Sequence, residues 1–364
     1  MRATLHPGRL AGRGHRLVAL LLLAGSVGCA TDPPRGAGAG DAPAEPESVT
    51  GLDLRVVSLV DFYYLIRHRA ALPEDATVEP TFARAVAAAR GVQEFFGGWG
   101  GWGPVDTLFL AAERLGDVRE QAERLPDPMR LRDGREIALR EPLLALLAAL
   151  EAVEPSFMDE HWPRRRLVLD EAVRDLERDF LPRHRQALGF MLRSLAIADP
   201  EIEAPLFLVS ETNAPGAFTF YLRGGTPACV VSIEDGVDTV LFETMLHEAT
   251  HVLDMASSDD TSVFVSLRSM LEQRGLSPDE PAVHDVPHTL MFVQAGETVR
   301  RFYDPQHVDY GAVTTLYARS EPIASIEREV WSAHLAGTIG RDEALRRIVE
   351  RTVAARPDSA DGSR

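Results

Sequence analysis

The sequence predicts an α+β protein that is predominantly helical and has a small antiparallel sheet. Two observations support this fold class. Between residues 51 and 200, apolar residues recur at three- and four-residue spacing, which is typical of amphipathic helices. From about residue 205 the pattern changes to three short runs rich in β-branched and aromatic residues, PLFLVSE, AFTFYLR and ACVVSIE, which favour strands. Helical patterns return after these runs and continue to about residue 354.

The chain begins with the pattern of an export signal. Four arginines and no acidic residue precede an apolar stretch at residues 18–30, which is too short to span a bilayer comfortably. The stretch ends in Gly28 and Cys29, and this junction resembles the lipobox of bacterial lipoproteins, in which the cysteine is lipidated. We therefore expect a signal peptide at residues 1–28, a lipid anchor on Cys29 that attaches the protein to a membrane, and a location in the cell envelope. Plain secretion with cleavage near Cys29 is the alternative.

Composition limits the class of protein. Residues 29–50 are rich in Pro, Gly, Ala and acidic residues, which predicts a disordered tether, and residues 356–364 form a similar tail. The 364 residues include 45% hydrophobic and 26% charged residues, as expected of a globular body. The formal net charge of −17 disfavours nucleic acid as a partner, because its phosphates would be repelled. Two cysteines are too few for a cysteine-rich zinc ribbon.

The region at residues 51–204 is expected to be a helical N-terminal region. Its pattern breaks at prolines and at FFGGWGGWGPVD, residues 95–106. This glycine and tryptophan stretch either forms a mobile loop over a cleft or a membrane, or packs its tryptophans against the adjacent helices. The region at residues 205–355 begins with the strand-like runs. Gly224 and Gly225 separate the last two of these runs, which predicts a hairpin.

A helix is predicted directly after the hairpin, at residues 241–256, with Asp238 or Thr239 as its N-cap. On a helical wheel its residues separate into two arcs. The apolar arc contains Leu241, Phe242, Met245, Leu246, Ala249, Val252, Leu253 and Ala256, and the polar arc contains Glu243, His247, Glu248, His251 and Asp254. We expect the apolar arc to face the core.

The polar arc carries the motif HEATH, residues 247–251. His247 and His251 are one turn apart, so both imidazoles can bind one metal ion, and zinc is the ion that this spacing favours. Glu248 lies beside the metal on the wheel, where it can act as general base toward a water molecule. The alternative is that both histidines are ordinary polar residues on a solvated helix face.

Strands followed by an HExxH helix and a later helix resemble the zincin metallopeptidases, and the resemblance covers roughly residues 205–335. The residues after His251 lack the glycine and histidine of the metzincin extension. The segment QAGETVRR resembles instead the helix from which gluzincins supply a glutamate, which implies Glu297 as third zinc ligand. Asp254, His288 and His284 are the alternatives for that position.

The zincin resemblance also implies residues around the metal. Asp254 and Glu243 are expected to orient the ligand imidazoles by hydrogen bonds. One of His307, Tyr310 and Tyr317 is expected to stabilise the oxyanion. The run ACVVSIE is expected to offer a free strand edge to an extended peptide substrate.

The sequence therefore predicts a zinc-dependent hydrolase, expected to be a peptidase, that is exported to the cell envelope. Its expected partners are a peptide or protein substrate and a membrane bound through the lipid anchor, and its expected cofactor is Zn²⁺. A non-catalytic envelope lipoprotein, with a structural zinc site or a helical binding role, is the alternative. A structural site would differ by having four protein ligands and no position for water.

Overall fold

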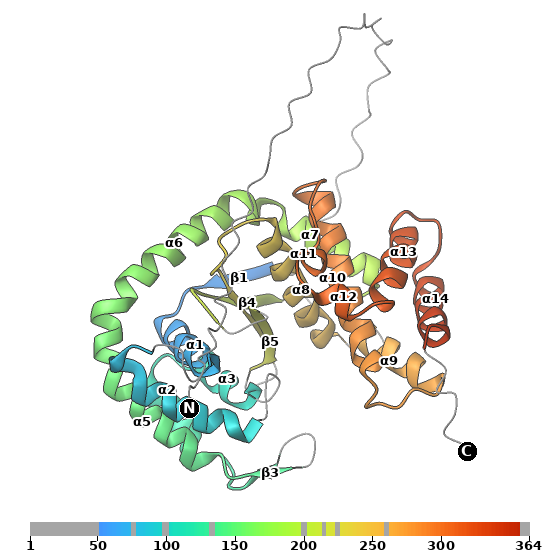
Figure 1. Ribbon diagram of the computed structural model, residues 1–364. Coiled ribbons are helices and arrows are strands. Elements are labelled where there is room, and N and C mark those ends of the chain that lie inside the picture. The colour runs from blue at the N-terminus through green and yellow to red at the C-terminus, as the bar shows by residue number, and fades with distance from the viewer. Residues whose placement is uncertain are drawn as a thin grey trace, which may run out of the picture. The chain divides into compact units, whose positions relative to one another are not determined.

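The computed structural model describes residues 51–73, 78–96, 102–130, 135–197, 202–212, 216–222, 226–257 and 262–356 (Figure 1). The expected signal peptide, lipidated Cys29, tether and all but the first residue of the tail lie outside these ranges. Among the helices in these ranges, none is long and apolar enough to cross a membrane.

A four-stranded mixed sheet lies at the centre of the fold. Its strand order is β1 (Gly51–Arg55), β4 (Glu203–Val209), β6 (Pro227–Ser232) and β5 (Ala217–Tyr221). The first three strands are parallel, and β5 is antiparallel to β6. The expected antiparallel sheet is therefore correct only for the β5–β6 hairpin. Residues 51–55 were expected to be helical, and that prediction is wrong, because they pair with β4.

Seven α-helices lie in the described part of the chain between β1 and β4. They are α1 (Ser58–Ala71), α2 (Ala83–Phe96), α3 (Gly103–Leu110), α4 (Leu115–Glu123), α5 (Arg140–Ser156), α6 (Trp162–Asp179) and α7 (Leu181–Leu195). A short ribbon of β2 (Met129–Arg130) and β3 (Glu136–Ile137) precedes α5. Trp102, from the glycine and tryptophan stretch, is buried, and its ring centroid lies 6.3 Å from that of Tyr63. This agrees with the alternative in which the tryptophans of this stretch pack against helices.

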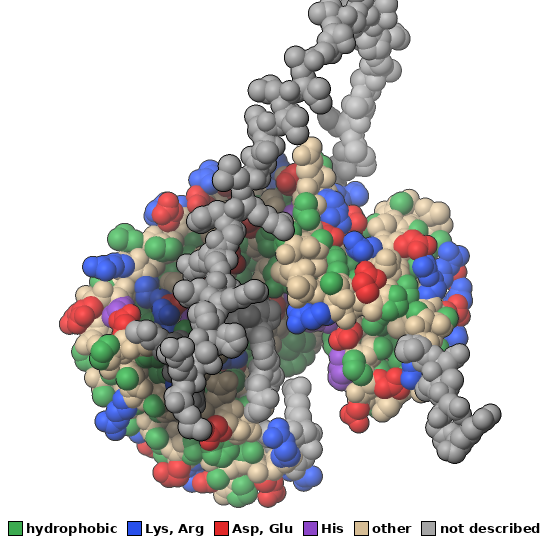
Figure 2. Space-filling view, viewed as in Figure 1, with side chains coloured by type: hydrophobic (Ala, Val, Ile, Leu, Met, Phe, Trp, Pro, Cys, Tyr) green, Lys and Arg blue, Asp and Glu red, His purple; other side chains and the backbone are tan. Residues whose placement is uncertain are grey.

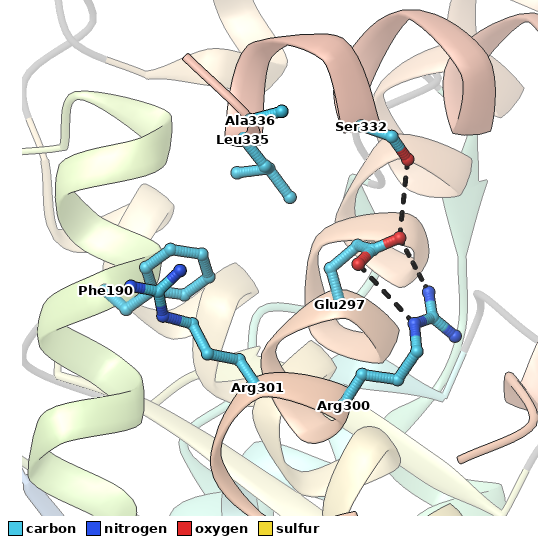
Figure 3. Close-up of a pocket in the computed structure, with 7 residues that line it drawn as sticks. All are labelled: Phe190, Glu297, Arg300, Arg301, Ser332, Leu335 and Ala336. Atoms are coloured by element: carbon cyan, nitrogen blue, oxygen red, sulfur yellow. Dashed lines mark hydrogen bonds and ion pairs between the residues drawn. The ribbon is translucent and has the colours of Figure 1, made fainter. Parts of the chain in front are cut away.

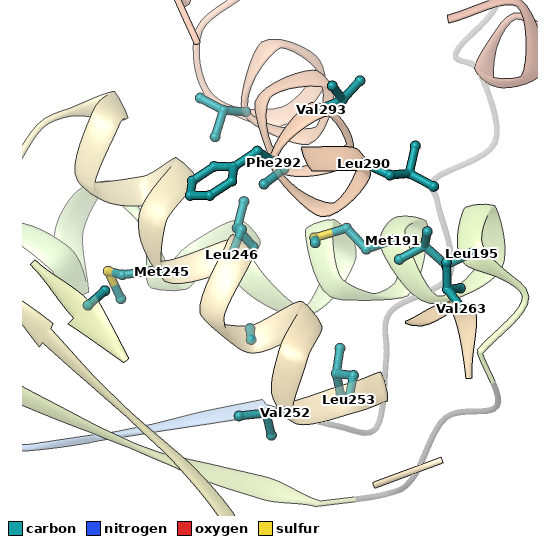
Figure 4. Packing of buried hydrophobic residues seen from close by; sticks show 14 of the residues in the cluster. Met191, Leu195, Met245, Leu246, Val252, Leu253, Val263, Leu290, Phe292 and Val293 are labelled. Atoms are coloured by element: carbon teal, nitrogen blue, oxygen red, sulfur yellow. The ribbon is translucent and has the colours of Figure 1, made fainter. Parts of the chain in front are cut away.

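Seven more α-helices lie in the described residues after β6. They are α8 (Thr239–Ala256), α9 (Val263–Gln273), α10 (Pro281–Phe302), α11 (Tyr310–Val313), α12 (Leu316–Arg319), α13 (Ile323–Leu335) and α14 (Arg341–Ala354). Helix α8 packs against β6, β5 and α10. Figure 4 shows Leu246 of α8 and Phe292 of α10 in the shared core, with Met191 of α7 beside them.

The central sheet separates two apolar cores, because successive side chains in a strand point to opposite faces. Phe207 and Val230 belong to the core that contains α1 to α5. Leu206 and Val231 belong to the core that contains α7, α8 and α10. Both faces of β4 and β6 are therefore covered by helices, as is usual for parallel strands. In Figure 1, α1, α2, α3 and α5 lie on one side of the sheet and α8 and α10 on the other.

The expected boundary between residues 204 and 205 does not coincide with a gap in the packing. Strand β1 pairs with β4, and Leu169 of α6 and Leu188 of α7 share the core of α8. All the described residues belong to one compact unit. On the face shown in Figure 2, arginine and acidic side chains are interspersed with apolar ones across the helices.

Candidate metal centre

Local sequence determines where helix α8 begins. The Asp238 carboxylate accepts hydrogen bonds from the backbone N–H groups of Val240 and Leu241, both at 2.9 Å. This is the expected N-cap, and it satisfies two amide groups that have no partner inside the helix. The apolar arc then packs into the core, with Met245 and Leu246 fully buried. The cap and this packing fix the direction in which the polar arc points.

The two histidines of HEATH face each other on α8. Their Nε2 atoms are 3.1 Å apart, and their ring centroids are 4.6 Å apart. His247 is buried and His251 is half-buried. The one-turn spacing therefore brings two imidazole nitrogens to one point, as the motif predicts.

A third histidine completes the group. His288 on α10 lies with its ring centroid 4.9 Å from that of His247 and 5.5 Å from that of His251. One ligand nitrogen from each of the three residues lies within 4.8 Å of the others. His288 is 37 residues after His251 in the sequence (288 − 251), and the packing of α10 against α8 brings its imidazole to the other two.

The surroundings keep these imidazoles neutral. Burial lowers the pKa of His247 well below its usual value, and the neighbouring histidines lower it further. Burial and His288 lower the pKa of His251 to about 3, and burial also lowers the pKa of His288. A neutral imidazole is the form that binds a metal ion. The Phe292 ring stacks on His247 with 3.5 Å between centroids, which holds that imidazole in place.

Glu248 lies between His247 and His251 in the sequence of α8 and is buried. The Thr219 hydroxyl on β5 donates a hydrogen bond to Glu248 Oε2. Burial raises the pKa of Glu248 to about 7, although the Thr219 hydrogen bond opposes the shift. A carboxylate with a pKa near neutrality can both accept and return a proton. The sequence did not suggest Thr219 as part of the site, because it is a single hydroxyl in a strand 29 residues away (248 − 219).

The strand edge beside the site belongs to β5 and not to β6. Strand β6, the predicted substrate platform, is paired with β4 on one side and with β5 on the other, so the prediction of a free edge there is wrong. Strand β5 is the last strand of the sheet order and carries Thr219. Its Tyr221 is 40% exposed and donates a hydrogen bond to the carbonyl of Met255 at the end of α8.

The structure does not bring Glu297, the predicted third ligand, to the histidines. His288 and Glu297 are both on α10 but nine residues apart, about two and a half turns, so they point to opposite faces of the helix. Glu297 pairs with Arg300 at 2.8 Å and accepts a hydrogen bond from Ser332 (Figure 3). These residues line a separate pocket of about 320 Å³ together with Phe190 and Arg301. The alternative ligand His284 is also on α10 but is exposed and outside the histidine group.

Asp254 has another role than the one expected from the sequence. It accepts hydrogen bonds from the Ser262 hydroxyl and from the Val263 amide, both at 2.7 Å. These contacts fasten the start of α9 to the end of α8. They occupy the carboxylate that was expected to orient a ligand imidazole.

Glu243 also contacts a different partner from the predicted ones. Its Oε2 accepts hydrogen bonds from His307 Nε2 and from the Tyr310 amide, both at 2.6 Å. Glu243, His307 and Asp309 form a second group of potential ligand atoms within 4.8 Å of one another, and all three are buried. A cation is already present there, because the Arg300 guanidinium pairs with Asp309. The expected bond from Glu243 to a ligand imidazole is therefore replaced by one to His307.

Of the three residues proposed for the oxyanion, Tyr310 is linked to the histidine group through Phe292. Its ring stacks on Phe292 at 5.2 Å and 10°, and Phe292 in turn stacks on His247. Burial raises the pKa of the Tyr310 phenol, so the phenol keeps its proton and can donate it in a hydrogen bond. Tyr317 is buried in the core beneath Arg328, and His307 is engaged by Glu243.

Comparisons of the chain with protein family models, with curated proteins and with solved structures found no match.

Proposed function

We propose that this protein is a zinc-dependent hydrolase that cleaves peptide bonds. The observation that carries the proposal is the convergence of three neutral imidazoles, His247, His251 and His288, together with the buried carboxylate of Glu248 on the turn of α8 that supplies two of them. Burial of His247 and Glu248 without a role would cost free energy, because both residues place polar atoms in a largely apolar interior.

The donor set fits zinc. Imidazole nitrogens are preferred zinc ligands, and three protein ligands are typical of catalytic sites, which keep one position open. Among the described residues the group contains three candidate ligands and not four, which favours catalysis over a structural site. Zinc held there would act as a Lewis acid that polarises the scissile carbonyl and promotes ionisation of water.

Glu248 would act as the general base. It would take a proton from the attacking water and return it to the amine nitrogen as the peptide bond breaks. Thr219 would hold the carboxylate in position, since its hydroxyl donates to Oε2. A zinc ion held by the three histidines would place a positive charge near Glu248. That charge would lower the pKa of Glu248 from about 7 and increase its ionised fraction at neutral pH.

Tyr310 would stabilise the negative charge that develops on the carbonyl oxygen. Its phenol keeps its proton, and its ring stacks on Phe292, which in turn stacks on His247. A hydrogen-bond donor aimed at a developing oxyanion typically contributes about 10²- to 10³-fold in rate.

An extended peptide is the substrate that the surroundings suit. Strand β5 pairs with only one neighbour among the described strands and reaches Glu248 through Thr219. A peptide that paired with this edge through its backbone would pass beside the general base.

We propose, from the sequence, that the body of the protein is held at the surface of a membrane in the cell envelope by lipid on Cys29.

Glu248→Gln tests the function most simply. Glutamine keeps the shape and the hydrogen bond from Thr219 but cannot accept a proton from water. We expect zinc content and melting temperature close to those of the wild type, and hydrolysis of a susceptible peptide reduced by roughly 10²- to 10⁴-fold. Glu297→Gln is the matched control, because it makes the same substitution on the face of α10 that points away from His288.

Two results would contradict this assignment. If Glu248→Gln cleaved the peptide as fast as the wild type, the base would be another residue. If zinc-loaded wild type cleaved no member of a peptide library, the site would be structural or would serve binding.

A further inference from the structure

A buried network connects α8 with the segment that carries Tyr310. Glu243 is fully buried one turn before His247, and His307 is 5% exposed. A buried carboxylate is stable only with hydrogen-bond partners, and the two that Glu243 has come from the same segment. One is the His307 imidazole and the other is the backbone amide of Tyr310.

The same segment is fastened to α8 a second time. His307 Nδ1 lies 3.0 Å from the hydroxyl of Thr239, at the start of α8. His307 therefore bridges Thr239 and Glu243, which are one turn apart on the helix that carries His247 and His251. This leaves the imidazole little freedom to move relative to the metal centre.

A third attachment joins the segment to α10. Asp309 pairs with Arg300, and Arg300 Nη1 also contacts the carbonyl of His307. Asp309 can approach because position 296 on α10 is glycine: a Cβ there would lie 2.5 Å from Asp309 Oδ1 and 3.5 Å from Glu243 Oε1. Residues 307–310 are thus held by both helices that supply histidines.

We propose that Glu243 and His307 are positioning residues for Tyr310. They hold the Tyr310 backbone so that its ring stacks on Phe292, which in turn stacks on His247. This inference rests on the proposed function, since it assigns Tyr310 a role in it. Misplacement of a reacting group by about 1 Å can reduce a rate by roughly 10²-fold, so such fastening has a measurable effect.

A metal ion at Glu243, His307 and Asp309 explains the network less well. Arg300 already supplies a positive charge to Asp309, and one oxygen of Glu243 already accepts two hydrogen bonds. The hydrogen bonds to Tyr310 and Thr239 explain why these residues gather where they do.

A double-mutant cycle tests the proposal, with Glu243→Ala, Tyr310→Phe and the double variant, all zinc-loaded. We expect Glu243→Ala alone to lower kcat by about 10- to 100-fold with a change in KM below about threefold. In the Tyr310→Phe background it should lower kcat no further, because the group that it positions is already absent. Glu327→Ala is the control: it removes another fully buried glutamate, and its effect should be the same in both backgrounds.

Hydrogen exchange provides a readout that does not depend on catalysis. Glu243→Ala should speed amide exchange across residues 303–317 at least tenfold while α5 keeps its protection. If Glu243→Ala does not fold, Thr239→Val, which removes only the hydroxyl near His307, should give a smaller change of the same kind.

Three outcomes would overturn the proposal. The first is unchanged amide exchange in residues 303–317. The second is a double variant whose fold-loss in kcat equals the product of the losses in the two single variants. The third is a second zinc equivalent in the wild type that Glu243→Ala loses. If the wild type cleaves nothing but exchange still rises as expected, the fastening role stands and the proposed function fails.

Discussion

Gly296 allows Asp309 and Glu243 to approach helix α10 closely, so Gly296→Ala should destabilise the protein. An added Cβ would lie 2.5 Å from Asp309 Oδ1. The carboxylate cannot move aside cheaply, because Arg300 holds it and it is 6% exposed. Such overpacking costs about 1–3 kcal/mol. Alanine in a helix interior offsets this by about 1 kcal/mol relative to glycine. The net loss is therefore about 0–2 kcal/mol.

Gly91→Ala on α2 is the matched control. It is also a helical glycine, but its added Cβ meets no atom within 4 Å. It should gain only the helix propensity, about 1 kcal/mol of stability. The free energies of unfolding of the two variants, from urea titrations at pH 7, should therefore differ by about 1–3 kcal/mol. Equal stabilisation by both substitutions would refute the close approach of Asp309 to α10.

Two further predictions concern other parts of the chain. Glu327 on α13 is fully buried with neither carboxylate oxygen hydrogen-bonded within the described structure, and burial raises its pKa well above its usual value of 4.5, with a further rise from Asp285. A carboxyl group whose pKa is raised in the folded state contributes stability below about pH 4.5, and this stability is lost as the pH rises. The free energy of unfolding of Glu327→Gln, from urea titrations, should therefore increase relative to that of the wild type between pH 5 and pH 8. Parallel curves of stability against pH would contradict this. Cys29→Ser should move the protein from the membrane fraction to the soluble fraction and remove an acyl mass, and a wild type that is soluble without such a mass would show plain secretion.

Helix α8 could be predicted well because its information is local. An aspartate before an apolar stretch marks the cap, and HEATH carries its own spacing. The wheel also placed Leu246 and His247 on different arcs. It could not show that both arcs are buried, since α10 and residues 307–310 cover the polar arc through contacts distant in sequence.

The third histidine could not be chosen from the sequence with the same reliability. His288 and Glu297 lie in one helix, α10, and both are residue types that bind zinc. Which of them faces α8 depends on the rotation of α10 in its packing, and no local pattern determines it. A half-turn difference in phase separates His288, which joins the histidine group, from Glu297, which pairs with Arg300.

Strand β1 was missed for a related reason. GLDLR is five residues long and runs almost directly into α1, so its alternation is too short to distinguish from the helical pattern that follows. Its partner is β4, about 150 residues later, and parallel pairing of this kind leaves no hairpin signal. The same limitation hid the fact that β6 is paired on both sides.

The zinc content of three purified proteins tests the central claim most directly: the wild type, His288→Ala and Glu297→Ala, each dialysed against buffer with a weak chelator. Both substitutions are on α10, so they perturb the same helix on opposite faces. We predict about one zinc ion per chain in the wild type and in Glu297→Ala, and a large loss in His288→Ala. Retention of zinc by His288→Ala with its loss from Glu297→Ala would contradict the three-histidine centre.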